Sequence, residues 1–227
     1  MAKISIVGAG PGSPDYVTPI ARKTVQNAAL VVGAERVLNL FKDDIKGETL
    51  KLTAKNLNEA LQRCADYAGK GKTVALLSTG DPGFSGLLRT FRNATKGKNV
   101  EVDVVPGVSS LQACAAKLAM TWDEARLFSF HDGTSLEKKK QLLSAVKKGN
   151  DVMMLPNPKD FTPSDVANFL IDGGVAADTS AVVCENLTLN SERVEKSTLK
   201  GISRMTFDPL CVMVIRPNRK QISQKHR

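Results

Sequence analysis

Short apolar runs alternate with amphipathic, helix-like stretches through the first half of the chain. Strands are predicted near residues 3–8, 30–33, 73–78 and 100–105, and helices near residues 18–28, 56–69 and 84–94. The apolar runs are short and rich in β-branched residues, which is typical of strands covered on both faces of a parallel sheet. Regular alternation of strands and helices therefore predicts an α/β domain with a mostly parallel sheet.

Two helix starts are explicit in the sequence. Thr18-Pro19 and Thr162-Pro163 each offer a capping hydroxyl followed by proline at the first helical position. The clearest helical face follows Asn56, which is expected to cap it, and consists of Leu57, Ala60, Leu61, Cys64, Ala65 and Ala68.

The second half of the chain has a different order of elements. After a helix at 111–119, the pattern predicts a strand at 127–130, a basic helix at 135–148, a strand at 151–155, a helix from 162, and strands at 181–184, 192–194 and 210–215. The last three strands are joined by short connections, which indicates a mixed, partly antiparallel sheet.

A Pro-Gly turn within residues 104–110 separates the two patterns. We therefore predict an N-terminal α/β domain over 1–108, a C-terminal α/β domain over 109–216, and a basic tail at 217–227 that is expected to be disordered.

Two glycine-rich loops follow predicted strands. The strand at 73–77 runs into Ser78-Thr79-Gly80-Asp81-Pro82-Gly83-Phe84, and the first strand runs into a loop with sequence GAGPGSPD at 8–15. Glycine permits close approach of a ligand to the backbone, and ligands of open α/β sheets bind at the carboxyl ends of the strands. Either loop alone is equally well explained as an ordinary turn. Two of them together predict one shared ligand site.

The first loop does not match a dinucleotide-binding fingerprint. The third glycine of G-x-G-x-x-G would fall at Ser13, and Pro11 and Pro14 stiffen a turn that should enter a helix directly. The fingerprint also expects an acidic residue after the second strand, and Glu35 follows the second apolar run, but this one residue does not make up for the mismatches in the loop. A nicotinamide or flavin cofactor is therefore not expected.

Composition narrows the class of protein. The chain has 227 residues, of which 42% are hydrophobic and 24% charged, as in soluble globular proteins. No apolar run approaches the ~20 residues that a membrane span needs, and no signal peptide is evident, so a cytoplasmic location without membrane contact is expected. The four cysteines lie far apart in apolar contexts and are expected to be core residues, with no metal site.

The formal net charge of +9 is compatible with nucleic acid, an acidic surface or an anionic small molecule. Only two tyrosines and one tryptophan are present, and none is interleaved with basic residues, so stacking on nucleic acid is not supported. Lys138–Lys140 are interpreted as solvated surface of the basic helix. An anionic small molecule stays open as the ligand.

Four motifs resemble the tetrapyrrole (corrin/porphyrin) methylase family in their order and spacing across nearly the whole chain: VGAGPGSP at 7–14, STGDPGF at 78–84, VVPGVSS at 104–110 and VVCENLT at 182–188. Further segments resemble the branch of that family that methylates C-5 of cobalt-precorrin-7: VVGAERVL at 31–38, MTWDEA at 120–125, SFHDG at 129–133 and CENLTLNSERV at 184–194. The segment at 129–133 departs from the family's usual His-Gly-basic order, because Asp132 precedes Gly133.

The resemblance implies two α/β domains with S-adenosylmethionine bound in a cleft between them, S-adenosylhomocysteine as product, a homodimer, and a role in the anaerobic route to cobalamin. The decarboxylating C-15 methyltransferase of that route would be a separate protein. Carried onto this chain, the family's cofactor contacts fall at Pro11, Thr79, Gly80, Asp81, Phe84, Ser109, Ser110, Leu155, Asn186 and Leu187.

Methyl transfer from a sulfonium requires alignment of carbon and sulfur, and neither a metal nor an activated serine. The acceptor, a bridging carbon of an electron-rich tetrapyrrole, attacks directly, and a base is needed only for a proton. Candidates for that base are Asp81, His131, Asp15 and Tyr16. A structural role is equally compatible with each: Asp81 as an acceptor of backbone amides, His131 as a loop residue.

Basic side chains are candidates for the carboxylates of such a substrate, although each is equally compatible with plain surface: Arg22, Arg36, Arg89 and Arg126. Three other functions remain: the precorrin-6Y methyltransferase of the aerobic pathway, a diphthine synthase or rRNA methyltransferase of the same fold, and a noncatalytic binding protein of that fold.

Overall fold

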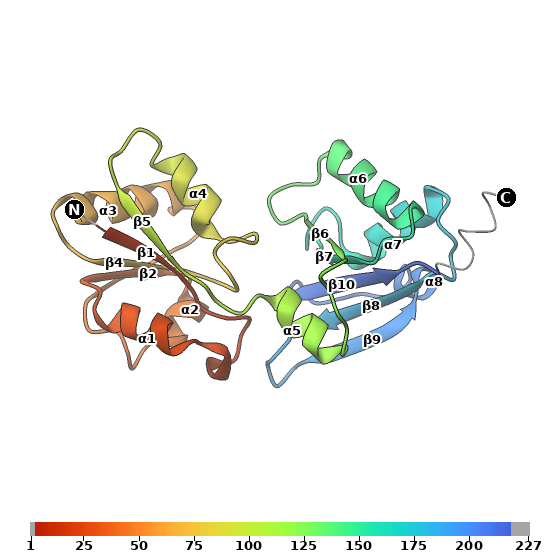
Figure 1. Ribbon diagram of the computed structural model, residues 1–227, viewed down its shortest axis with the longest axis horizontal. Helices are drawn as coiled ribbons and strands as arrows, with labels where there is room; N and C mark the ends of the chain where they lie inside the picture. Colours follow the sequence, from red (N-terminus) through yellow and green to blue (C-terminus); the bar gives the residue numbers. More distant parts are fainter. Residues whose placement is uncertain (1–2, 219–227) are drawn as a thin grey trace. The chain divides into compact units, whose positions relative to one another are not determined.

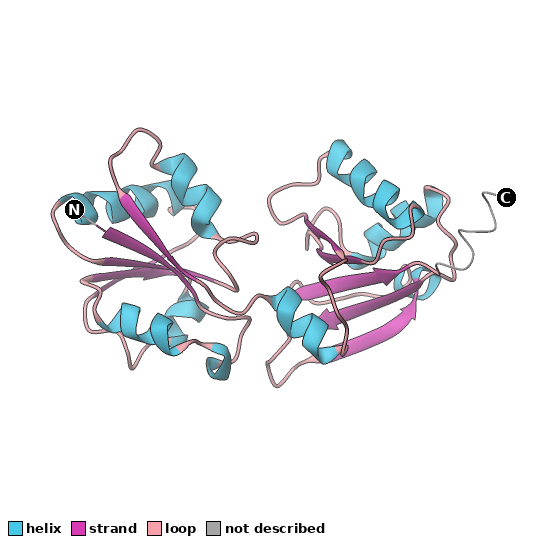
Figure 2. Cartoon of the chain, viewed as in Figure 1, coloured by secondary structure: helices cyan, strands magenta, loops and turns pink. Residues whose placement is uncertain are grey.

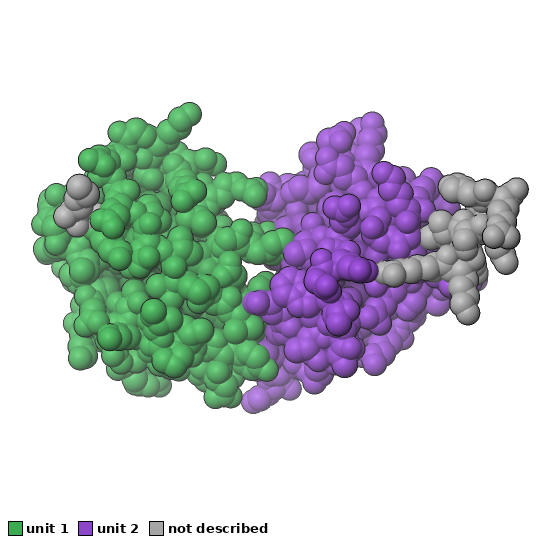
Figure 3. Space-filling view, in the orientation of Figure 1, with its two compact units in different colours: residues 1–110 green, residues 111–227 purple. Residues whose placement is uncertain are grey.

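The computed structural model describes residues 3–218, whose path is shown in Figure 1. The chain divides after Ser110 into two compact units, coloured separately in Figure 3. Apart from its first two residues, the predicted basic tail at 217–227 lies outside the described residues. None of the helices within 3–218 combines the length and the apolar character that crossing a membrane requires.

The first unit contains a parallel sheet with strand order β3-β2-β4-β1-β5. Its strands are β1 (Lys3–Gly8), β2 (Leu30–Gly33), β3 (Glu48–Lys51), β4 (Val74–Ser78) and β5 (Glu101–Val105). The parallel sheet predicted from the alternating pattern is thereby confirmed. Strand β3 was not predicted, because it is a mostly exposed edge strand without an apolar run.

Helices cover both faces of this sheet (Figure 2): α1 (Pro19–Gln26) and α2 (Glu35–Leu40) on one face, and α3 (Leu57–Gly69) and α4 (Leu87–Ala94) on the other. Successive strand residues face opposite sides, so Leu77 packs with α1 and α2 while Leu76 packs with α3. Each fully buried side chain of this kind contributes about 1.5–3 kcal/mol.

The predicted helix starts have mixed outcomes. The Thr18 hydroxyl accepts a hydrogen bond from the Ala21 amide at 3.2 Å, and Thr162 forms a full capping box with Asp165. The predicted Asn56 cap is wrong. Asn56 Oδ1 accepts from the Thr53 amide at 2.7 Å, because its side chain closes the preceding turn instead.

The second unit contains a mixed sheet, as predicted, and its strand order is β6-β7-β10-β8-β9. Strands β6 and β7 are parallel, and β10 is antiparallel to both β7 and β8. The elements are α5 (Ser110–Lys117), β6 (Arg126–Ser129), α6 (Leu136–Lys147), β7 (Val152–Leu155), α7 (Pro163–Asp172), β8 (Ser180–Glu185), β9 (Arg193–Thr198), α8 (Leu199–Ile202) and β10 (Cys211–Arg216).

The core of the second unit lies between this sheet and α6, α7 and α8. The ring of Phe161 makes edge contacts with Phe130 at 4.9 Å and with Phe169 at 5.7 Å between ring centroids. All four cysteines of the chain are buried free thiols, as expected for core residues. The Cys114 thiol of α5 and the Cys184 thiol of β8 are hydrogen-bonded to each other, which raises the pKa of Cys114, as does burial.

Candidate functional site

The topology of the first sheet selects one place for a ligand. Helix α1 follows β1 and packs on one face, whereas α4 follows the neighbouring strand β4 and packs on the other (Figure 1). Where adjacent parallel strands lead to opposite faces, their connections diverge and leave a crevice beyond the carboxyl ends. Both glycine-rich loops of the sequence lie at this point, after β1 and β4.

The loops after β1, β4 and β5 meet through bare backbone. A Cβ atom at Gly8 would lie 2.4 Å from the Gly107 nitrogen, and one at Gly107 would lie 2.5 Å from the Gly80 oxygen. The strands continue to pair beyond their ends, since the Gly80 amide donates to the Gly10 oxygen at 2.9 Å. Gly10 and Gly80 also have φ values of 75° and 67°, which disfavour other residues. Glycine is therefore required sterically where these three loops cross.

Asp81 fastens two of these loops to each other. Its Oδ1 accepts a hydrogen bond from the Gly83 amide at 2.8 Å, and its Oδ2 accepts from the Gly107 amide at 3.2 Å. The carboxylate thus holds its own loop and the turn after β5. This geometry supports the structural interpretation of Asp81 over its use as a base.

The remainder of the 79–86 loop is equally constrained, and α4 begins at Leu87, three residues after the predicted position 84. The Ser78 hydroxyl accepts from the Leu87 amide at 3.1 Å, and Ser85 has a left-handed φ of 55°. A Cβ atom at Gly86 would lie 2.6 Å from both the backbone carbonyl oxygen of Asp81 and Ser78 Oγ. Thr79 is left exposed on this fixed backbone.

The other predicted contacts in the first unit lie in the same three loops. Pro11 is buried in the loop after β1, Phe84 is half-buried after β4, and Ser109 and Ser110 follow β5. The structure therefore brings together all seven site residues predicted for this unit at one edge of one sheet.

The second unit gathers the remaining predicted residues at an edge of its own sheet. Because β7 and β8 are both antiparallel to β10, their carboxyl ends, at Leu155 and Glu185, lie on the same edge. Asn186, with φ of 50°, and the buried Leu187 follow β8 directly. The Asn186 amide donates to the Leu210 oxygen at 2.8 Å, and its Nδ2 donates to Asp208 at 2.5 Å.

Sequence reasoning missed the buried carboxylate beneath this loop. Glu185 is 2% exposed and accepts hydrogen bonds from Arg193 Nε and, at 2.6 Å, from the Asp208 amide. Arg193 also donates to the Thr206 oxygen at 3.2 Å. This network ties β8 and β9 to the 206–208 segment that holds Asn186. An acidic residue ending an otherwise apolar strand was the available signal.

His131 lies on that same edge, two residues past the end of β6. Ser129 of β6 pairs with Leu155 of β7, so His131 is close to the end of β7. Desolvation of the ring by the surrounding chain lowers the pKa of His131 below its usual value, whereas the charge of Asp132 and the Pro156 carbonyl act to raise it.

Two basic residues have structural roles that the sequence did not indicate. The interpretation of Lys138 as solvated surface is wrong, because its ammonium donates to the Ser129 oxygen at 2.7 Å and to Asp132 at 2.9 Å. Arg22 pairs with Asp44 at 2.6 Å and donates to the Pro14 oxygen at 3.2 Å, which fastens the first loop.

The other candidates for substrate carboxylates or for the base are at the surface. Arg36, Arg89 and Arg126 are exposed, as are Tyr16 and Asp15. Asp15 accepts a hydrogen bond from the Ser13 hydroxyl at 3.1 Å. Among residues 3–218, no group of three or more His, Cys, Asp or Glu side chains is arranged to hold a metal ion.

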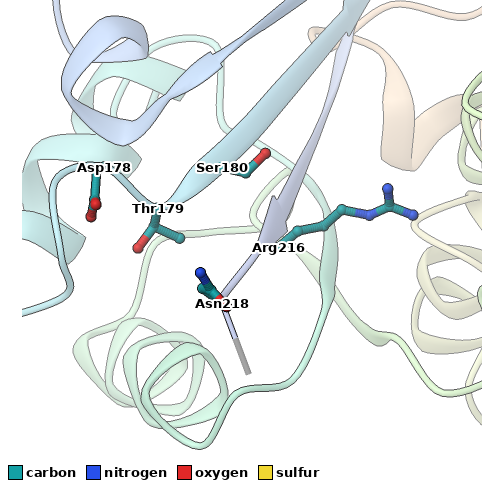
Figure 4. Close-up of a pocket in the computed structure, with 5 residues that line it drawn as sticks. All are labelled: Asp178, Thr179, Ser180, Arg216 and Asn218. Carbon is teal, nitrogen blue, oxygen red and sulfur yellow. The ribbon is translucent and has the colours of Figure 1, made fainter. Parts of the chain in front are cut away.

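A small open pocket of about 270 Å³ lies elsewhere in the second unit (Figure 4). It is lined by Asp178, Thr179, Ser180, Arg216 and Asn218, where β8 begins and β10 ends. That edge is opposite to the one that carries Leu155 and Asn186. The Arg216 side chain extends away from Asp178 (Figure 4), so the two charges do not converge on a ligand.

Comparison with known proteins identifies the family. The model of the tetrapyrrole (corrin/porphyrin) methylases matches residues 3–203. The chain belongs to this family. A probable cobalt-precorrin-7 C(5)-methyltransferase of Methanocaldococcus jannaschii is 38% identical over 211 residues, covering 93% of this chain and 96% of that relative. The resemblance inferred from the motifs is thereby confirmed, and the chain is a methyltransferase.

Solved structures agree with this fold. The cobalamin biosynthesis precorrin-6Y methylase (cbiE) of Archaeoglobus fulgidus has a TM-score of 0.74 at 22% identity, covering 96% of this chain and 100% of that one. Uroporphyrin-III C-methyl transferase of Thermus thermophilus, complexed with S-adenosyl homocysteine, has a TM-score of 0.76 at 21% identity, with 94% and 92% covered. The two-domain α/β fold predicted from the sequence is confirmed.

Proposed function

We propose that this protein transfers a methyl group from S-adenosylmethionine to C-5 of cobalt-precorrin-7, in the anaerobic route to cobalamin. The observation that carries the proposal is the 38% identity to the M. jannaschii relative over almost the full length of both chains. The segments at 120–133 and 184–194, which resemble the C-5 branch of the family, favour the same substrate.

The predicted donor contacts lie beyond the carboxyl ends of strands in each of the two sheets. S-adenosylmethionine combines an apolar, hydrogen-bonding adenosine with a cationic sulfonium and an amino-acid group, all of which backbone amides and carbonyls can recognise. The proposed contacts are Pro11, Thr79, Gly80, Asp81, Phe84, Ser109, Ser110, Leu155, Asn186 and Leu187. The fixed backbone of the 79–86 loop, with its left-handed Gly80 and Ser85, supports this assignment.

When bound, this donor supplies an electrophilic methyl group with a neutral thioether as leaving group. The chain's contribution is therefore alignment of donor and acceptor rather than covalent catalysis. Rigid loops suit that task, because the loops held by Asp81 and by Arg22 lose little further freedom when a ligand orders them.

The net charge of +9 suits a substrate with several acetate and propionate carboxylates. Arg36, Arg89 and Arg126 are exposed and compatible with binding them by charge-assisted hydrogen bonds. We further propose a cytoplasmic homodimer that works beside a separate decarboxylating C-15 methyltransferase, and no contact with nucleic acid.

The proposal is tested by incubating the protein with cobalt-precorrin-7 and S-adenosylmethionine carrying a ¹³C methyl group. Carbon-13 NMR is expected to show a single new methyl at C-5, with a mass increase of one methyl group. A methyl at C-15, or no product with donor that calorimetry shows to be bound, would contradict the site assignment.

The same assay separates the other functions. Faster methylation of the metal-free substrate would favour the aerobic precorrin-6Y activity. Methylation of elongation factor or ribosomal RNA, and not of the corrinoid, would favour the diphthine synthase or rRNA activities. Failure to bind the donor at all would favour the interpretation as a noncatalytic binding protein.

A further inference from the structure

We propose that the His131 imidazole accepts the proton that leaves C-5 after the methyl group has been added. The inference rests on the proposed function, because it assigns a role within that reaction.

The loop that carries His131 is held more firmly than a surface connection requires. Lys138 of α6 donates to the Ser129 oxygen at 2.7 Å and to the Asp132 carboxylate at 2.9 Å. From the other side, Asn157 Nδ2 donates to the Phe130 oxygen at 3.1 Å. These bonds reach the loop from two different elements, so His131 lies on a fixed rather than a mobile segment.

The bonds on both sides are themselves supported. The backbone of Asn157 pairs with that of Phe161, and its Oδ1 accepts from the amides of Lys159 at 2.9 Å and Asp160 at 3.0 Å. Lys138 lies over the ring of buried Phe130, 5.6 Å from its centroid. Packing of the core therefore determines where the His131 loop stands.

The histidine is anchored through its backbone, and its ring is accessible. The His131 amide donates to Ser129 Oγ at 3.3 Å, and the residue is exposed. An accessible imidazole on a fixed loop suits a proton acceptor.

The position of His131 agrees with its proposed partner atoms. It stands at the edge that also carries Leu155 and Asn186, which are proposed contacts of the methyl donor. The charge of Asp132, in its own loop, acts to raise the pKa of His131, and this carboxylate is paired with Lys138 of α6 at 2.9 Å. The lowered pKa of His131 keeps the imidazole neutral at neutral pH.

The step balances without a further reactant. The C-5 π electrons form the new carbon–carbon bond while the sulfur–methyl bond breaks, and its electron pair stays on sulfur. C-5 then carries a methyl group and its original hydrogen. The unprotonated ring nitrogen of His131 takes that hydrogen as a proton, and the C–H electron pair restores conjugation in the macrocycle.

The test compares wild type with His131→Gln, whose side-chain amide still donates a hydrogen bond but accepts no proton. We expect kcat to fall by about 100-fold or more, as for loss of a general base, with donor affinity by calorimetry unchanged. Substrate deuterated at C-5 is expected to show a primary isotope effect in the variant, because proton removal becomes rate-limiting. The control is Lys140→Gln, at an exposed position of α6, which should leave kcat unchanged.

Other results would overturn the assignment. A raised KM with unchanged kcat in His131→Gln would mean that the ring binds a substrate carboxylate. A kcat within tenfold of wild type would exclude the base role. If the variant does not fold, the wild-type pH profile decides: kcat should fall on the acid side through a pKa below the usual histidine value, and a flat profile refutes the proposal. Absence of any C-5 methylation by wild type would instead refute the proposed function.

Discussion

Replacing Asp81 separates a structural role from a catalytic one. Its carboxylate accepts hydrogen bonds from the Gly83 amide at 2.8 Å and the Gly107 amide at 3.2 Å, and Asp81 is half-buried. In Asp81→Ala both amides lose their acceptor, and the turn after β5 is released from the 79–86 loop. Asp81→Asn keeps the size of the side chain but offers only one acceptor oxygen.

The magnitude follows from these two bonds. A hydrogen bond to a charged group contributes about 1.5–3 kcal/mol. One bond is long and the site is partly solvated, so the lower end applies, and we expect Asp81→Ala to lower the free energy of unfolding by about 2–3 kcal/mol. Asp81→Asn should lose about half of that. Donor affinity should fall in both variants, since the loop backbone is no longer fixed.

Urea unfolding followed by circular dichroism measures the stability, and calorimetry with S-adenosylmethionine measures the affinity. The matched control is Asp66→Ala, whose exposed carboxylate pairs with Lys98 at 3.1 Å and should contribute about 0–1 kcal/mol. Unchanged stability and donor affinity in Asp81→Ala, with a large loss of kcat, would refute the structural role and make Asp81 the base.

Three further predictions concern packing and titration. Gly107→Ala places a Cβ atom 2.5 Å from the Gly80 oxygen, so the backbone must move, and both stability and donor affinity should drop. The control is Gly69→Ala, which has open space at its Cβ and should be neutral or stabilising in thermal unfolding. Glu185→Gln weakens a buried carboxylate network and should cost about 1–3 kcal/mol in urea unfolding, with weaker donor binding; unchanged donor affinity would contradict a site at the Asn186 loop. Burial raises the pKa of the Cys64 thiol from 9.0 to about 12. Between pH 9 and 12 the thiol therefore ionises in the unfolded chain but not in the folded protein, so the thermal midpoint should fall as the pH rises through this range. Cys64→Ala should lessen that fall.

Local sequence rules predicted most of the elements but failed where a side chain had two possible partners. Thr18 and Thr162 cap their helices as predicted, because proline at the next position fixes the geometry. Asn56 bonds to the turn behind it instead. The edge strand β3 has no apolar run, because one side of it is left to solvent, and so it leaves no pattern to find.

The sequence predicted which loops form the site, but not which side-chain interactions hold them. Motif resemblance selected the loops that follow β1, β4 and β5, and the structure brings those loops together. The roles of Lys138, Arg22 and Glu185 were not predictable, since each depends on partners 6 to 23 residues away that only folding brings into contact.

By itself the sequence determined the family, the alternation of elements and the glycine positions, because these depend on residue type and spacing along the chain. Only the tertiary structure decided what the polar residues do. It made Asp81 an acceptor of two backbone amides and held the loop that carries His131 from two sides. A carboxylate or imidazole has the same intrinsic chemistry everywhere, and its function follows from which donors and acceptors the fold places around it.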